Sequence, residues 1–296
     1  MHRMTMLGPG IPAATLWTPA DLLTAPQIWY DDTSAVTNVG GNCSQWNDIS
    51  GNAYHCTQAT AGQRPLIVAS GLNGRRILRF DGTDDELRAT STGAVNIFQN
   101  VTEGFIFGLH KLNPPDGALT QRGYFWWARN GSTTSRVALG AGGTTGGGGV
   151  AINGPYAGGR RLDADSFFGA ESPTGYGNVW AMCLGIFDFT NRVITLHIDG
   201  AQSDQQTGAW GAGGATSNTA SNGVVIGGID SGASHFVGDL AELMAGASLP
   251  DQAEIDKIFG YMAYKWGLQG SLPTDHPFKH RPPDLSDVSL WTGALS

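Results

Sequence analysis

The sequence is poor in charge and in long apolar runs, and each shortage excludes a class of protein. Only 14% of the 296 residues are charged, and the net charge is −8. Binding to nucleic-acid phosphates needs clustered lysine and arginine, which this chain lacks. No apolar run is long enough to span a bilayer, and the N-terminus lacks the apolar core of a signal peptide. We therefore expect a soluble protein with no nucleic-acid partner and no membrane insertion.

Cysteine is also scarce. Cys43, Cys56 and Cys183 match neither a metal-site spacing nor an even disulfide framework. We expect three reduced thiols, although a Cys43–Cys56 bridge stays open for a protein that leaves the cell. The chain also lacks the Gly-x-Ser-x-Gly, His-Glu-x-x-His and phosphate-loop motifs. The familiar signatures of nucleophilic, zinc and nucleotide chemistry are therefore missing.

The chain is rich in glycine and in short runs where every second residue is apolar. It contains 44 glycines, and its short apolar runs are separated by Gly, Asn, Ser and Thr, which favours a β-sandwich. Residues 179–200 carry the clearest pattern, two runs with every second residue apolar on either side of a polar step. We expect an antiparallel hairpin with one face on the core and the other open or lined by a groove. About ten such strands are expected in two packed antiparallel sheets.

The two ends differ from this β region. Helical spacing and capping residues predict one amphipathic helix over residues 249–266, ending at Gly267. We divide the chain into an N-terminal docking arm (1–27), a domain that includes the helix (28–270) and an extended C-terminal tail (271–296). Proline-rich ends with apolar side chains suggest docking to other polypeptides, such as a neighbouring subunit. The expected docking residues are Trp17, Leu22, Leu285, Leu290 and Trp291.

Several short motifs together resemble one known superfamily. They include Trp46-Asn47-Asp48, Phe80-Asp81-Gly82-Thr83-Asp84-Asp85, Gly238-Asp239-Leu240-Ala241-Glu242 and Tyr261-Met262-Ala263-Tyr264-Lys265-Trp266-Gly267. The combination covers roughly residues 28–278 and resembles the concanavalin A-like lectin/glucanase superfamily, in the laminin-G-like form found in bacterial and bacteriophage virion proteins. The resemblance implies a jelly-roll β-sandwich.

The same resemblance implies a role. We expect a non-enzymatic virion structural protein, made in the host cytoplasm and displayed on the particle as a capsid decoration, head fibre or tail component. Its expected partners are other virion proteins and sister subunits in a homo-oligomer. Two alternatives stay open: an adhesin that binds host-surface glycan, and a glycan hydrolase.

The hydrolase alternative needs two carboxylates about 5 Å apart across the sugar. The nearest approach is Asp239-Leu240-Ala241-Glu242, whose acids lie on opposite sides of a regular strand unless a bulge intervenes. We favour a structural role, in which Glu242 anchors the strand near the helix and Asp239 is solvated. No catalytic residue is assigned.

Two further sets of residues are candidates for binding. The acidic turn with Asp81, Asp84 and Asp85 could supply oxygen ligands to Ca²⁺, although a solvated turn without any cofactor is the favoured interpretation. Sugar binding would need exposed aromatic rings beside polar groups. The candidates for sugar binding are Trp127, Tyr156, Tyr176 and Trp210.

Overall fold

The computed structural model describes residues 15–113, 122–128, 135–141, 154–219, 223–229 and 235–287, and this part of the chain is mostly β. Every pairing between its strands is antiparallel. The strands are β1 (Ile28–Tyr30), β2 (Val36–Val39), β3 (Asn42–Trp46), β4 (Cys56–Thr57), β5 (Leu66–Leu72), β6 (Arg75–Asp81), β7 (Leu87–Ala89), β8 (Glu103–Leu112), β9 (Arg122–Ala128), β10 (Ser135–Ala141), β11 (Pro155–Gly159), β12 (Phe168–Glu171), β13 (Trp180–Asp188), β14 (Val193–Ile198), β15 (Ala201–Thr207), β16 (Gly223–Ile226) and β17 (Val237–Gly246). The predicted all-β class is confirmed, with more and shorter strands than the ten expected.

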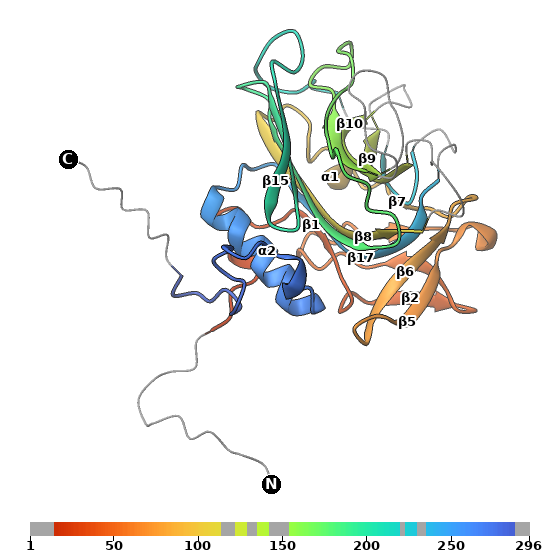
Figure 1. Ribbon diagram of the computed structural model, residues 1–296. Coiled ribbons are helices and arrows are strands. Elements are labelled where there is room, and N and C mark those ends of the chain that lie inside the picture. The colour runs from red at the N-terminus through yellow and green to blue at the C-terminus, as the bar shows by residue number, and fades with distance from the viewer. Residues whose placement is uncertain are drawn as a thin grey trace.

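The strands form one hydrogen-bonded network that folds into two facing layers (Figure 1). In the first layer β17 pairs with β8 on one edge and with β1 and β6 on the other, and β13, β14 and β15 follow β8. The second layer runs from β12 through β11, β10, β9 and β16 to β7. The β5–β6 hairpin, which pairs with β17, joins the two layers through β3 and β4, and β4 pairs with β7. A large apolar core with side chains from both layers lies between them.

The hairpin expected at residues 179–200 is present as β13 and β14, with Leu184 opposite His197. Its two faces contribute to different cores. Cys183 and Phe187 face the core between the layers, whereas Met182 and Leu184 belong to a second core with the C-terminal helix. The expectation that one face is open or lines a groove is therefore wrong, because the helix covers that face.

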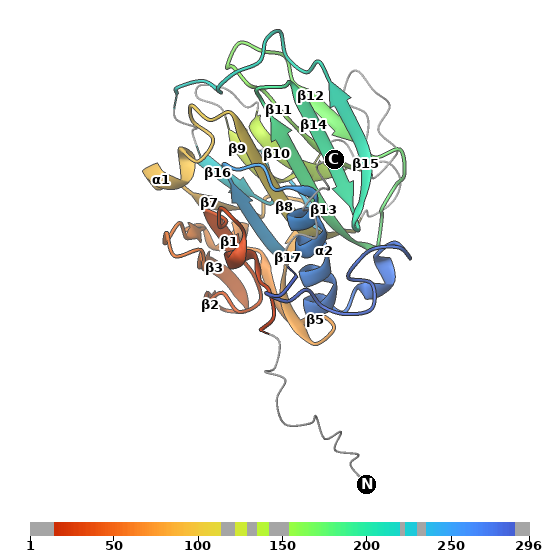
Figure 2. The same cartoon turned by 90° about the vertical axis from the view of Figure 1, so that its left-hand side faces the viewer.

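The C-terminal helix α2 (Gln252–Trp266) lies across β17, β8 and β13 (Figure 2). It begins three residues later than predicted, because Asp251 is its N-cap and accepts a hydrogen bond from the Glu254 backbone N–H at 2.8 Å. It ends at Gly267, whose φ of 69° is left-handed, as the sequence predicts. The shorter helical elements are η1 (Pro19–Asp21), η2 (Ala61–Gln63), α1 (Thr92–Val95) and η3 (Gln269–Ser271).

Both terminal segments fold back onto this helix. The Trp17 backbone N–H donates to the Pro283 carbonyl at 3.1 Å, and Leu16 bridges to Asp284. Trp17 and Leu22 are buried in the core that α2 forms with the first layer. This burial contradicts the prediction that these two side chains dock on a partner, because α2 of the same chain already covers them.

The structure describes only one of the other three predicted docking residues. The Leu285 side chain is exposed, while Leu290 and Trp291 lie outside the described residues. Cys43, Cys56 and Cys183 are buried free thiols, as expected. Among the described residues, no helix has the length and apolar character that crossing a membrane requires.

Candidate functional site

Two of the four predicted sugar-binding rings are core residues. Trp127 packs edge-on against Phe98, with ring centroids 4.9 Å apart, and its Nε1 donates to the Ala94 carbonyl at 3.1 Å. Trp210 packs on Phe189, and its Nε1 donates to a backbone carbonyl at 3.2 Å. Neither ring has an exposed face, which contradicts their assignment as sugar platforms.

The tyrosines of that set have different environments. Tyr156 is buried beside Phe167, with ring centroids 6.3 Å apart, so it too offers no free ring face. Tyr176 is half-buried. Burial, followed by the charge of Asp199, raises the pKa of the Tyr176 phenol. Tyr176 is thus the one member of the set whose side chain is partly exposed and could contact a ligand.

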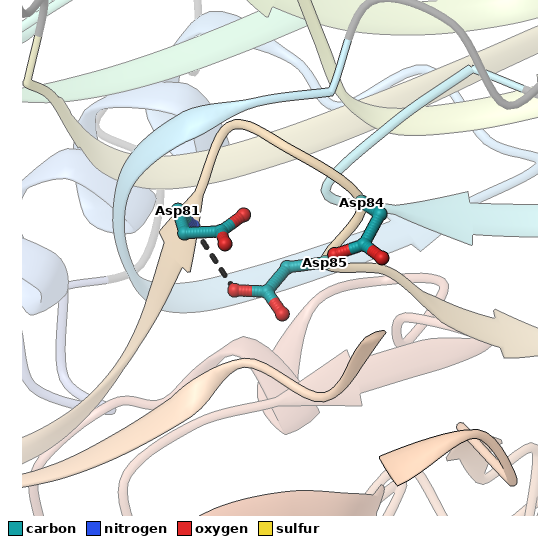
Figure 3. A group of neighbouring side chains, drawn as sticks. All are labelled: Asp81, Asp84 and Asp85. Atoms are coloured by element: carbon teal, nitrogen blue, oxygen red, sulfur yellow. Dashed lines mark hydrogen bonds between the residues drawn. The ribbon is translucent and has the colours of Figure 1, made fainter. Parts of the chain in front are cut away.

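The loop between β6 and β7 brings the three predicted metal ligands together (Figure 3). A carboxylate oxygen from each of Asp81, Asp84 and Asp85 lies within 4.8 Å of the others. Asp85 also accepts a hydrogen bond from the Asp81 backbone N–H at 2.9 Å, and Asp81 accepts one from Thr83 N–H at 2.7 Å. Oxygen donors at this spacing could hold a divalent cation such as Ca²⁺, which stays a prediction.

Asp85 is the buried member of these three aspartates. Burial, together with the charges of Asp81 and Asp84, raises the pKa of the Asp85 carboxyl to about 6. Since an opposing charge favours the ionised form, a bound cation would lower this pKa. Near pH 6, cation binding and protonation would therefore compete for this carboxyl.

Asp239 and Glu242 were expected on opposite sides of a regular strand unless a bulge intervened, and β17 has such a bulge between them. The pairing of β17 with β8 shifts register between Leu240 and Glu242, which puts one extra residue into the strand. Asp239 is buried rather than solvated, and it pairs with the Arg79 guanidinium at 2.7 Å and with Lys111 Nζ at 3.4 Å. Its carboxylate is therefore already neutralised by two cations.

Glu242 was predicted to anchor its strand near the helix, and in the structure it joins β17 to α2. Both of its oxygens accept from indoles, Oε1 from Trp29 Nε1 at 2.7 Å and Oε2 from Trp266 Nε1 at 2.6 Å. Lys265 Nζ lies 2.8 Å from Oε2 and also contacts Asp31. In this buried cluster the Glu242 carboxylate therefore meets hydrogen-bond donors, and the Lys265 ammonium meets carboxylates.

The charges of this cluster stabilise one another. Burial alone would lower the pKa of Lys265, but the facing Glu242, Tyr261 and Asp31 outweigh it and raise that pKa. Burial would raise the pKa of Asp31, and Lys265 lowers it instead. For Glu242, burial dominates and raises the pKa. The cluster is a structural junction, and its carboxylates are not free to attack or protonate a substrate.

A pocket that sequence analysis did not identify lies between α2 and the two terminal segments. It has a volume of about 370 Å³. Its lining includes Trp17, Arg75, Tyr261, Tyr264, Pro282 and Pro283. The helical spacing of Tyr261 and Tyr264 was visible in the sequence, but the pocket arises only when both ends fold over the helix.

Comparison with known proteins shows similarity in fold. No protein-family model matches the sequence, and no curated protein matches it. An arabinofuranosidase solved with arabinofuranosyl-α-1,2-xylobiose is 13% identical, with 83% of this chain and 60% of that chain covered and a TM-score of 0.56. A GH54 α-L-arabinofuranosidase is 14% identical, with coverages of 77% and 51% and a TM-score of 0.51. The binding domain of botulinum neurotoxin serotype D is 10% identical, with coverages of 81% and 52% and a TM-score of 0.51.

These likenesses concern the β architecture, since the identities are low. The chain spans between about half and three fifths of the length of these three structures.

Replacing Lys265 with Met should destabilise the protein by about 3–5 kcal/mol, because it leaves Glu242 and Asp31 buried without their cation. The loss should shrink at acid pH, where protonation removes the charge of Glu242. Urea unfolding at pH 8 and pH 4.5 measures both effects. Lys257→Met on the same helix is the control and should change stability by less than about 0.5 kcal/mol. A loss of equal size at both pH values would show that packing, rather than charge, causes it.

The second prediction concerns the pH dependence of stability at Asp85. Its pKa of about 6 in the folded protein lies above the ordinary value of 3.8, so its contribution to stability is lost as pH rises through about 6. Asp85→Asn keeps an acceptor for the Asp81 N–H and removes the charge. Relative to wild type, this variant should gain stability between pH 4 and 7.5, on the order of 1 kcal/mol.

Thermal unfolding in the presence of a chelator checks this, with Asp188→Asn at the end of β13 as control. Asp199, whose pKa burial also raises to about 6, remains in all three proteins and cancels in the comparison. Parallel pH curves for Asp85→Asn and wild type would contradict the assignment.

Proposed function

We propose that this chain is a carbohydrate-binding β domain with no catalytic centre of its own, built as a jelly roll of the concanavalin A-like lectin/glucanase type. The observation that carries the proposal is its fold, which resembles an arabinofuranosidase solved with a bound oligosaccharide and the binding domain of a toxin. Two facing antiparallel layers are consistent with the jelly roll expected from the sequence motifs.

The carboxylates support binding rather than hydrolysis. A retaining glycosidase needs one carboxyl as acid and a second as nucleophile about 5 Å away. Asp239 is held by Arg79 and Lys111, and Glu242 is held by Lys265 and two indoles beneath α2. A sugar could not reach Glu242 without displacing the helix, and it could not reach the buried Asp239 without breaking its ion pairs with Arg79 and Lys111.

The test is a binding and turnover screen with the whole chain. Titration with neutral oligosaccharides, including arabinofuranosyl-xylobiose, xylohexaose and lactose, should detect at least one ligand with a dissociation constant between about 10 μM and 1 mM. No reducing ends should be released from the corresponding polysaccharides. Repeating the titration in EDTA reports whether a cation at the Asp85 loop contributes.

Two results would contradict this proposal. Failure to bind any oligosaccharide or surface glycan would remove carbohydrate binding. Hydrolysis that disappears in Glu242→Gln, with the fold intact, would establish the hydrolase alternative instead.

A second candidate function is a structural role on a virus particle, in which the domain is displayed through contacts with sister subunits or other virion proteins. The observation that favours it is a set of exposed leucines on the terminal segments and beside the start of α2. The side chain of Leu23 is 93% exposed and that of Leu16 is 57% exposed. Leu249 and Leu285 are also exposed. Single exposed leucines are ordinary, but several on one set of segments suggest contact with another polypeptide.

This second candidate predicts self-association that depends on the exposed leucines. Sedimentation of wild type and of a Leu23→Ser, Leu285→Ser variant should show an oligomer that dissociates at least tenfold more readily in the variant. Leu66→Ser, another exposed leucine on β5, serves as the control. A wild type that stays monomeric up to about 100 μM would contradict assembly through copies of this chain.

A further inference from the structure

The pocket between α2 and the terminal segments has walls that are held in place. Besides the Trp17 N–H bond to Pro283, the Leu285 N–H donates to the Thr15 carbonyl at 2.9 Å, so the two segments are joined edge to edge. The Trp17 ring packs edge-on against Tyr261, with centroids 6.4 Å apart. A site whose walls are ordered by the protein itself loses little entropy when a ligand binds.

The cations at the pocket are already balanced. Arg75 Nη1 pairs with Asp32 at 2.7 Å, and Lys265 pairs with Glu242 and Asp31. Among the described residues, Arg75 has a hydrogen-bond partner only at Nη1, which leaves its other N–H groups available as donors. The lining thus combines aromatic rings with a donor whose charge is neutralised, in a chain of net charge −8. An anionic ligand gains no net attraction here.

Size and chemistry then favour one class of ligand. A volume of about 370 Å³ lies at the small end of ligand sites, which matches one or two sugar rings. The apolar face of a sugar suits an aromatic ring, and its hydroxyl groups suit a guanidinium donor. A purely apolar ligand would offer no acceptor to the Arg75 donors.

We propose that this pocket binds one or two residues of a neutral saccharide, with Tyr264 as the stacking ring and Arg75 as the hydrogen-bond donor. The inference rests on the proposed carbohydrate-binding function and assigns a place to it, on the helix side of the first layer. Tyr264 is half-buried and is not part of either apolar core, so its ring is available without unfolding the helix.

The experiment compares tyrosine variants in the whole chain, each first checked for an unchanged thermal midpoint. The probes are arabinofuranosyl-xylobiose, xylohexaose, lactose and, as an anionic counterpart, trigalacturonic acid. Tyr264→Ala should weaken binding of the neutral probe by at least about tenfold, while Tyr264→Phe should retain it within threefold. Tyr176→Ala tests the competing location, because Tyr176 is also half-buried but lies outside this pocket. Phe168→Ala is the control and should leave binding unchanged, because Phe168 is an exposed ring on β12 outside this pocket.

The outcomes separate this inference from the function on which it rests. Binding by wild type that is lost in Tyr176→Ala and kept in Tyr264→Ala would overturn the location while leaving carbohydrate binding intact. No binding of any neutral probe, in wild type, would remove both. Tighter binding of trigalacturonic acid than of the neutral probes would overturn the saccharide class.

A competing occupant is tested in the same titration. A synthetic peptide of residues 286–296, which carries the uncharged run Val-Ser-Leu-Trp-Thr-Gly-Ala-Leu-Ser, is added in place of sugar. Peptide binding that depends on Tyr264, with no sugar binding, would show that the pocket takes a chain segment and would overturn the saccharide inference.

Discussion

The contact between Lys265 and Glu242 determines how the helix α2 sits on the first layer. A buried carboxylate is costly unless it is paired and hydrogen-bonded, and Glu242 meets an ammonium and two indoles. Trp29 lies in β1, and Lys265 and Trp266 are the last two residues of α2. The cluster therefore determines both the position and the rotation of the helix on β17. Apolar packing alone would hold the helix against the sheet but would specify its rotation less sharply.

Once α2 is placed, the terminal segments have somewhere to fold. Trp17 and Leu22 bury their side chains in the core under the helix, and the segment that carries Pro283 pairs with residues 15–17. Apolar residues in a proline-rich end therefore indicate a covered surface without telling which chain covers it. Here the same chain does so for Trp17 and Leu22, and the neighbouring leucines stay outside.

The sequence predicted the periodic parts of the fold. The β13–β14 hairpin and α2 carry strong alternation and clear caps, and both lie close to where the sequence placed them. The structure has more strands than the ten expected, and strands such as β2, β4 and β7 contain only two to four residues, which is too little pattern for the sequence to predict them. The bulge at Ala241 was left open in the sequence, since one inserted residue changes hydrogen bonding without changing composition.

Binding residues were predicted less well, and the cause is physical. Alternation separates the two faces of a strand, but it does not say which face meets water when a second layer and a helix cover both. Trp127 and Trp210 therefore looked like sugar platforms and are core rings, whose indole N–H groups are satisfied by backbone carbonyls. Tyr264 is different because its surroundings come from three distant segments. A site assembled by closure of the chain ends leaves no local signature, and only the folded arrangement shows the aromatic face that remains open.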